Sequence, residues 1–261
     1  MVVGQVSSAA DSPVGDVSPT LPVALAETCR VVGSTIPLWE LHRARLERGG
    51  CSVELLADVE RAVEAAIAAY DGERSSRLRL HLEVGTDGSV AVEMTRALSS
   101  LDVVGGPVLA VIRAADLPRM PALPPGAAKP ADRSWWDSAA RAARRERAHQ
   151  ALIVDDDGFV IDGSSASVWV ASRGRLSTPP SPWAIDGVAR RYVFDRAGDL
   201  DVEVAAAPVR LGDVETADEV FLTNAFGGAV SVRDREGPVG EAIRGLFAAA
   251  LGGAPARGAG V

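Results

Sequence analysis

The chain has 261 residues and 27.1 kDa, which gives room for one large domain or two smaller ones with a core that needs neither disulfides nor metal. Its net charge of −8 and its pI of about 5.0 argue against nucleic acid or an anionic membrane as a partner. Two cysteines, Cys29 and Cys51, are too few for a disulfide framework or a zinc site, and no apolar run is long enough to span a bilayer, so we expect a cytoplasmic protein.

The first part of the chain mixes strand and helix patterns. Strands are expected at residues 24–32, 35–38, 77–84, 89–94 and 107–114, and helices at residues 38–48 and 53–70. Gly85–Gly88 separates two alternating segments, which predicts a β-hairpin.

A proline-rich stretch follows at residues 116–128. We interpret it as a linker between a small N-terminal α/β domain, residues 1–115, and a larger C-terminal domain, residues 129–261. In the second domain we expect helices at residues 134–149, 187–196 and 239–251, and strands at residues 151–155, 159–162, 168–171, 176–178, 202–206 and 220–223.

Lysine is nearly absent from this chain. Of the 27 basic residues, 26 are arginines and one is Lys129. A compositional bias toward arginine explains the scarcity, and chance alone could leave one lysine. The alternative is that Lys129 is kept because an amine can lose its proton or form a Schiff base, which a guanidinium cannot do.

Two further segments are candidates for anion binding. Arg45 shares a face with apolar residues on the helix expected at residues 38–48, so it requires an anionic partner unless it reaches solvent at a domain edge. Gly187 stands where a helix begins, and backbone N–H groups at a helix start bind phosphate well. Taken alone, the second segment is better explained as a common loop-to-helix junction.

Taken in order, several motifs resemble those of the fold-type IV pyridoxal-phosphate enzymes, which include class IV aminotransferases and 4-amino-4-deoxychorismate lyase. Residues 27–31 (Glu-Thr-Cys-Arg-Val) and 38–46 resemble the N-terminal signature of that family, and Lys129-x-x-x-Arg133 is similar to its lysine motif. The remaining similar segments are residues 158–169, 176–180, 187–190 and 219–225. The resemblance runs from about residue 20 to residue 240.

The resemblance implies a role for each matching residue. Lys129 would be the catalytic Schiff-base lysine and proton shuttle, and Thr28 would lie near the substrate as a proton donor. The cofactor, pyridoxal 5′-phosphate, would be bound by Arg45, Asp162, the N–H groups of Val188 and Ala189, and the segment Asn224–Ala225.

Asp162 departs from the family pattern, because a glutamate normally stands at this position. An acid there would keep the pyridine nitrogen of the cofactor protonated. Strand alternation places Val160 and Asp162 on the same side. From the residues alone, a turn or N-cap aspartate before Gly163 explains the position equally well.

The sequence therefore predicts an α/β fold (α+β type) with two domains and a cofactor site at their interface. The resemblance implies a homodimer that acts on a small-molecule amino substrate and uses no metal. The first hypothesis is a lyase similar to aminodeoxychorismate lyase, because Asn224–Phe226 resembles the lyases. The alternatives are an aminotransferase of the branched-chain or D-amino acid type and a cofactor-free binding protein.

Overall fold

The computed structural model describes residues 20–73, 77–180 and 184–252. The chain forms two compact units, which are treated separately below. Unit 1 comprises Met1–Ala97 and Ala122–Asp132, and unit 2 comprises Leu98–Pro121 and Arg133–Val261. Among the described residues, no helix has both the length and the apolar character needed to cross a bilayer.

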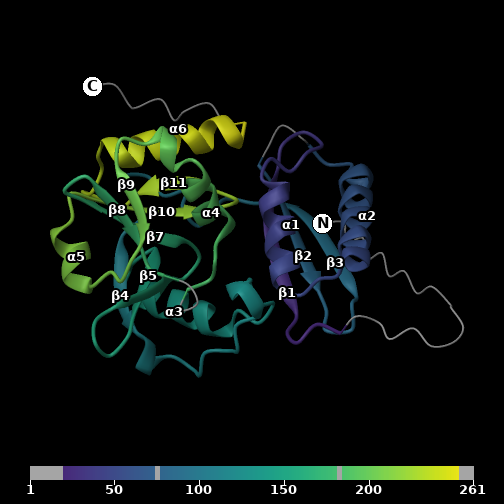
Figure 1. Ribbon diagram of the computed structural model, residues 1–261, viewed down its shortest axis with the longest axis horizontal. Helices are drawn as coiled ribbons and strands as arrows, with labels where there is room; N and C mark the ends of the chain where they lie inside the picture. Colours follow the sequence, from purple (N-terminus) through teal and green to yellow (C-terminus); the bar gives the residue numbers. More distant parts are fainter. Residues whose placement is uncertain (1–19, 74–76, 181–183, 253–261) are drawn as a thin grey trace, which may run out of the picture. The chain divides into compact units, whose positions relative to one another are not determined.

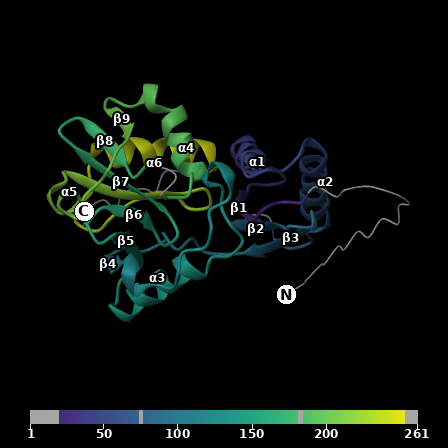
Figure 2. The same cartoon turned by 60° about the horizontal axis from the view of Figure 1, so that its bottom comes forward.

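Unit 1 is an antiparallel sheet with two helices on one face. The strands are β1 (Leu25–Val31), β2 (Leu78–Val84) and β3 (Val90–Arg96), in the order β1-β2-β3. The helices α1 (Trp39–Arg48) and α2 (Val53–Ala69) lie on the same side of these strands (Figure 1, Figure 2). This arrangement confirms the hairpin and both helices that the sequence predicts for this part of the chain.

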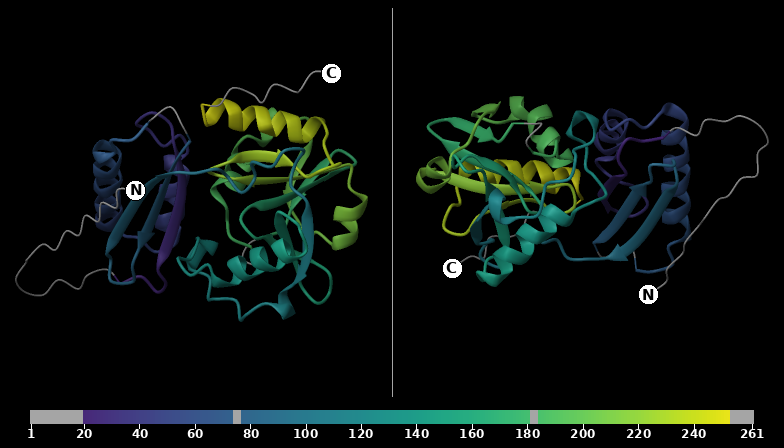
Figure 3. Two further views of the ribbon diagram at one scale, coloured as in Figure 1. Left: turned by 180° about the vertical axis from the view of Figure 1, so that it is seen from behind. Right: turned by 90° about the horizontal axis from the view of Figure 1, so that it is seen from below.

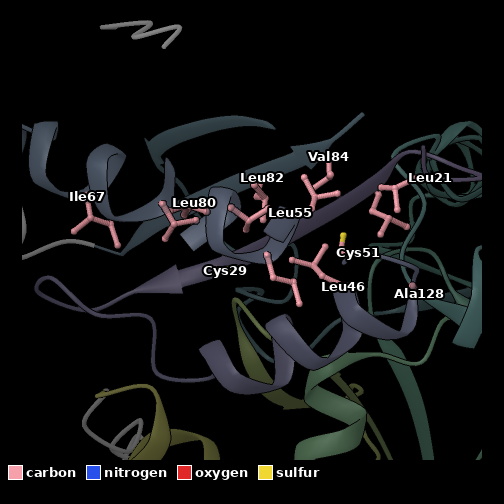
Figure 4. Packing of buried hydrophobic residues seen from close by; sticks show 14 of the residues in the cluster. Leu21, Cys29, Leu46, Cys51, Leu55, Ile67, Leu80, Leu82, Val84 and Ala128 are labelled. Carbon is pink, nitrogen blue, oxygen red and sulfur yellow. The ribbon is translucent and has the colours of Figure 1, made fainter. Parts of the chain in front are cut away.

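Period-two alternation in β2 builds the core of unit 1. Leu78, Leu80, Leu82 and Val84 are each 0% exposed, while the residues between them are polar. They pack against the apolar face of α2, and Figure 4 shows Leu55 and Ile67 of that helix in the same cluster. Ser52 begins α2 by accepting a hydrogen bond from the backbone N–H of Leu55 at 3.2 Å.

The prediction of a short strand at residues 35–38 is wrong. Val32 and Thr35 exchange two backbone hydrogen bonds, of 2.9 and 3.1 Å, and close a tight turn. Gly33 adopts φ +63° within it, a conformation that glycine reaches without strain. The chain therefore passes directly from the turn into α1.

The described part of unit 2 contains two sheets and four α-helices. The larger sheet has the order β11-β10-β7-β8-β9, and the smaller has the order β4-β5-β6. The strands are β4 (Leu109–Arg113), β5 (Gln150–Val154), β6 (Val160–Gly163), β7 (Ser167–Ser172), β8 (Arg175–Thr178), β9 (Glu203–Ala206), β10 (Glu219–Asn224) and β11 (Gly228–Ser231). The helices are α3 (Ser134–Arg145), α4 (Val188–Asp195), α5 (Leu211–Thr216) and α6 (Pro238–Ala250).

The helices of unit 2 cover its strands from two sides. α6 packs on β10 and β11, whereas α3 packs on β4 and β5. Figure 3 shows α3 and α6 on opposite sides of the strands. The sequence did not predict α5 or β11, because the first is only six residues long and the second, Gly-Ala-Val-Ser, becomes a strand through its pairing with β10.

The two units differ from the domains expected at residues 1–115 and 129–261. β4 pairs in parallel with β5, so the segment around it belongs to unit 2. The segment around Lys129 instead pairs with the edge of β1 in unit 1. The chain therefore leaves unit 1 after Ala97, returns at Ala122 and leaves again after Asp132.

Candidate functional site

Lys129 lies beside Thr28 in unit 1. The backbone N–H of Ala26 donates to the carbonyl of Lys129 at 3.0 Å, and that of Ala131 donates to the carbonyl of Ala24 at 2.8 Å. These bonds hold the lysine segment along β1, and Lys129 Nζ donates to Thr28 Oγ1 at 2.8 Å. The structure thus brings together the two predicted catalytic residues, which are 101 positions apart in the chain.

Next to Thr28 on β1, Glu27 forms a buried cluster with two residues of α1. Arg45 Nε donates to Glu27 Oε1 at 2.7 Å, and Arg45 Nη2 donates to Glu27 Oε2. His42 Nδ1 lies 2.6 Å from Glu27 Oε2. The three residues are 1%, 5% and 0% exposed for Glu27, Arg45 and His42. Arg45 therefore has the anionic partner that its place on an apolar helix face requires, and the alternative of a solvent-reaching arginine is wrong.

Local sequence explains why this cluster is internal. Glu27 occupies a register position of β1 between Leu25 and Cys29, both of which are buried in the core of unit 1. On α1, His42 and Arg45 fall on the buried face together with Leu46. Side chains repeat on one face every two residues in the strand and every 3.6 residues in the helix. These two periods place the Glu27 carboxylate and its partners on α1 so that they point toward each other.

The cluster carries one ion pair and a neutral histidine. Burial acts to raise the pKa of Glu27, but Arg45 and His42 outweigh it and lower that pKa to about 2. Burial is also the main reason why the pKa of His42 is lowered, so the imidazole is neutral near pH 7 and its Nδ1–H donates to Glu27. No described residue hydrogen-bonds to the other ring nitrogen, Nε2.

The ion pair with Glu27 bears on the predicted role of Arg45 in binding the cofactor phosphate. Its guanidinium already meets a carboxylate, so any contact with a cofactor phosphate must be made in addition to the Glu27 pair. The phosphate role of Arg45 stays a prediction.

In unit 2, Asp162 is buried on β6. The expectation that Val160 and Asp162 face the same side is wrong, because a register shift pairs Asp162 with Ile153 and Val160 with the next residue of β5, Val154, whose side chain points to the other face. Its Oδ1 accepts the backbone N–H of Gly163 at 2.9 Å, and its Oδ2 accepts the indole N–H of Trp136 at 3.2 Å. Burial raises the pKa of Asp162 to about 6, against the opposing effects of Arg133, Gly163 and Trp136. The carboxylate thus has dipolar donors, and its ionised form would gain from a further positive partner.

Val188 and Ala189 are the first two residues of α4, and both are buried. Gly187 precedes the helix in an extended conformation, and no described side chain caps its start. The third residue, Arg190, pairs with Asp186 at 2.9 Å between Nη1 and Oδ1, and no hydrogen-bond partner of its Nε lies in the described part of the chain. The start of α4 therefore combines backbone N–H groups that no described side chain caps with a buried guanidinium, which suits an anion.

Asn224 and Ala225 lie where β10 turns into β11. Asn224 Oδ1 accepts the backbone N–H groups of Phe226 at 3.2 Å and of Gly227 at 2.6 Å, and its Nδ2 donates to the carbonyl of Ser165 at 3.3 Å. The asparagine therefore has a structural role in closing this turn. Its predicted contact with a cofactor, like that of Ala225, stays a prediction.

Sequence reasoning assigned no role to the two residues that organise these clusters, Glu27 and Trp136. Glu27 had a usable signal, because a charged residue at an inward-facing strand position requires a partner, and Arg45 required one as well. Trp136 had no comparable signal, since a tryptophan on the apolar face of a helix is ordinarily a core residue. Only the tertiary contact with Asp162 distinguishes it.

The buried pair predicts a specific stability defect. Glu27→Gln leaves Arg45 without its carboxylate, so we expect the free energy of unfolding to fall by about 3–5 kcal/mol near pH 7. The folded pKa of Glu27, about 2, lies below its ordinary value of 4.5. The contribution of Glu27 is therefore complete above about pH 4.5 and declines as the pH falls toward 2. Urea unfolding from pH 7 down to pH 3 should show a weaker acid dependence in the variant.

Glu60→Gln is the matched control. It removes a 2.8 Å contact with Arg43, but both side chains are about one-third exposed, so the change should cost less than about 1 kcal/mol. Equal costs for the two variants would contradict the assignment of Glu27 as the buried partner of Arg45.

Part of the chain is similar in sequence to a curated protein. The chain is 35% identical over 91 residues to a protein of Methanocaldococcus jannaschii assigned as a branched-chain-amino-acid aminotransferase. The match covers 34% of this chain and 32% of that relative. The chain thus matches about a third of the length of this curated relative.

Solved structures show the same fold over most of the chain. A hypothetical aminotransferase from Mycobacterium tuberculosis, in its PLP-bound form, superposes with a TM-score of 0.71 and 21% identity, covering 92% of this chain and 94% of that chain. The crystal structure of a protein assigned as a 4-amino-4-deoxychorismate lyase gives a TM-score of 0.70 and 23% identity, covering 88% of each chain. These likenesses confirm the predicted fold class.

A protein-family model also matches most of the chain. Residues 24–234 match the model of amino-transferase class IV, and this range contains all the residues of both clusters described above. Members of this family bind pyridoxal phosphate. The chain belongs to the class IV aminotransferase family of pyridoxal-phosphate enzymes.

Proposed function

We propose that the protein is a pyridoxal-phosphate-dependent aminotransferase that moves an amino group from an amino acid to a 2-oxo acid. The observation that carries the proposal is the placement of the sole lysine, Lys129, by backbone bonds along β1 with its Nζ 2.8 Å from Thr28 Oγ1. The family and the curated branched-chain relative support transamination ahead of lyase chemistry. A homodimer and a cytoplasmic location are part of the same proposal.

Each unit, taken by itself, carries residues whose chemistry suits one part of the cofactor. In unit 1, Lys129 supplies the amine that would hold it covalently, and Arg45 supplies a guanidinium that would suit its phosphate. In unit 2, Asp162 supplies a buried acid, and the start of α4, at Val188 and Ala189, supplies backbone N–H groups that would suit a phosphate. When bound, pyridoxal phosphate provides an electron sink for breaking bonds at the amino-bearing carbon.

The protein's own residues would then handle the protons. Lys129 Nζ, when free and unprotonated, would be the base that accepts a proton from the amino-bearing carbon of the substrate. Thr28 accepts a hydrogen bond from that amine and fixes its direction. Asp162, when ionised, would accept a hydrogen bond from a protonated pyridine nitrogen.

Lyase chemistry is the second candidate, and a specific observation favours it. The hydroxyl of Thr28 touches the amine of Lys129, so a proton donor stands beside the group that would remove the substrate's proton. The segment Asn224–Phe226 also resembles the lyases. The activity would be elimination of pyruvate from an aminated chorismate derivative. A cofactor-free binding protein is the third candidate.

Borohydride trapping tests the cofactor attachment. Reduction of the purified protein with bound pyridoxal phosphate should fix the cofactor on Lys129, because no other side chain carries a primary amine. Peptide mapping by mass spectrometry locates the label. Lys129→Arg keeps the positive charge and should lose the label, whereas a label confined to the α-amino group, or no label, would reject the proposal in favour of the cofactor-free candidate.

An acceptor panel separates the two enzymatic candidates. An aminotransferase should show half-reactions in which amino acids convert the bound cofactor to its amine form, and turnover should require an added 2-oxo acid. A lyase should release pyruvate from an aminated chorismate derivative without any acceptor. Pyruvate release without an acceptor, combined with no transfer to any 2-oxo acid, would replace the first candidate with the second.

Asp162→Asn tests the acid. An amide cannot keep the pyridine nitrogen protonated, so turnover should fall by orders of magnitude, while cofactor binding persists through Lys129 and the phosphate contacts. Asparagine can still accept the N–H of Gly163, so the local turn is preserved. Asp157→Asn, in the exposed β5–β6 turn, is the control. Near wild-type turnover in the Asp162 variant would reject the role of Asp162 in holding the pyridine proton and would leave it only a structural role in the turn.

A further inference from the structure

Trp136 is a buried tryptophan whose indole N–H points at a carboxylate. The side chain is 0% exposed, and its Nε1 donates to Asp162 Oδ2 at 3.2 Å. An indole N–H can only donate, so this contact favours the ionised carboxylate over the acid. Trp136 therefore acts on the charge state of Asp162 as well as filling the core.

The indole ring of Trp136 has two further contacts. The guanidinium of Arg133 lies over it, with Cζ 4.3 Å from the ring centroid. Trp135 packs edge-to-face against it at 5.2 Å between centroids and an interplanar angle of 87°. A cation over the ring draws electron density from it and strengthens the N–H as a donor. The position and the donor strength of the indole are thus both set by the start of α3.

Aspartate needs this support more than glutamate would. Its side chain is one methylene shorter, so the carboxylate cannot move toward a ligand without losing its protein contacts. Oδ1 is committed to the N–H of Gly163 at 2.9 Å, and Trp136 sets the direction of Oδ2, which also lies 3.5 Å from the N–H of Ile185. A single side-chain donor, the indole of Trp136, therefore sets the rotation of the carboxylate.

The charged groups facing Asp162 come from two helices. Arg133, at the start of α3, acts on it through space, and so does Arg190 of α4. Arg190 is itself paired with Asp186 at 2.9 Å. No hydrogen bond between Asp162 and either guanidinium is present among the described residues. The indole is thus the only side chain in the described structure that hydrogen-bonds to this carboxylate.

We propose that Trp136 is a positioning residue that holds the Asp162 carboxylate, in the orientation and ionised state in which it can bind the pyridine N–H of the cofactor. The proposal rests on the proposed function for the identity of the bound group. Its first part, the dependence of Asp162 on the indole, concerns the protein alone.

The dependence can be measured without cofactor. Selective ¹³Cγ-aspartate labelling, with the Asp162 signal identified by its loss in Asp162→Asn, gives the titration midpoint of this carboxyl by NMR in the cofactor-free protein. Trp136→Phe keeps the ring and removes the donor, so the midpoint should rise by about one pH unit. Trp135→Phe is the matched control, since Trp135 is equally buried and adjacent, and it should leave the midpoint within about 0.3 of wild type.

A second readout addresses the bound state. With ¹⁵N-labelled pyridoxal phosphate, the pyridine nitrogen should be protonated in wild type and in Trp135→Phe, and should lose its proton at lower pH in Trp136→Phe. If wild type binds the cofactor and both midpoints are unchanged in Trp136→Phe, the positioning role is overturned while the proposed function stands. If wild type binds no cofactor, the proposed function fails, and the carboxyl titration still decides whether Trp136 controls Asp162.

One measurement needs no change at Trp136. In wild type, the indole ¹H–¹⁵N signal of Trp136 should move as Asp162 titrates, and this movement should vanish in Asp162→Asn. An indole signal that ignores the protonation of Asp162 would overturn the proposal even if Trp136→Phe failed to fold.

Discussion

The buried ion pair between Glu27 and Arg45 is the constraint on which unit 1 depends. A carboxylate at a core position of β1 is tolerable only with a cation and donors around it, and α1 supplies both through Arg45 and His42. The pair therefore fixes how α1 lies on the sheet. It also fixes β1, which carries Thr28 on its opposite face and the segment of Lys129 at its edge. Placement of the Lys129 amine thus follows from an interaction that the amine does not make.

Unit 2 solves a similar problem in a different way. Asp162 is also buried, but its hydrogen-bond donors are neutral: two backbone N–H groups and the indole of Trp136. The pKa values of the two carboxyl groups move in opposite directions as a result. The pKa of Glu27, beside a full positive charge, is lowered to about 2, whereas that of Asp162 is raised to about 6. Glu27 makes direct hydrogen bonds to the guanidinium of Arg45, whereas Arg133 acts on Asp162 only through space. The two buried carboxylates therefore differ in whether a cation contacts them directly.

Chain order alone did not indicate which segments would be neighbours. The proline-rich stretch reads as a linker, yet the residues following it return to β1 because main-chain donors of Ala26 and Ala131 bond there. β4 joins β5 because their backbones pair in parallel. Such pairings depend on groups that every residue carries, so side-chain patterns do not predict them. This is why the elements were predicted well and their assignment to units was not.

The sequence by itself determined the elements with clear periodicity, the single amine and, through the order of its motifs, the family. Those features depend on local spacing or on residue identity. Tertiary structure decided the partners: Glu27 for Arg45, Thr28 for Lys129 and Trp136 for Asp162. Each of these contacts joins residues that lie far apart in the chain. Only the packing of a helix on a sheet, or of one strand beside another, brings them within hydrogen-bonding distance.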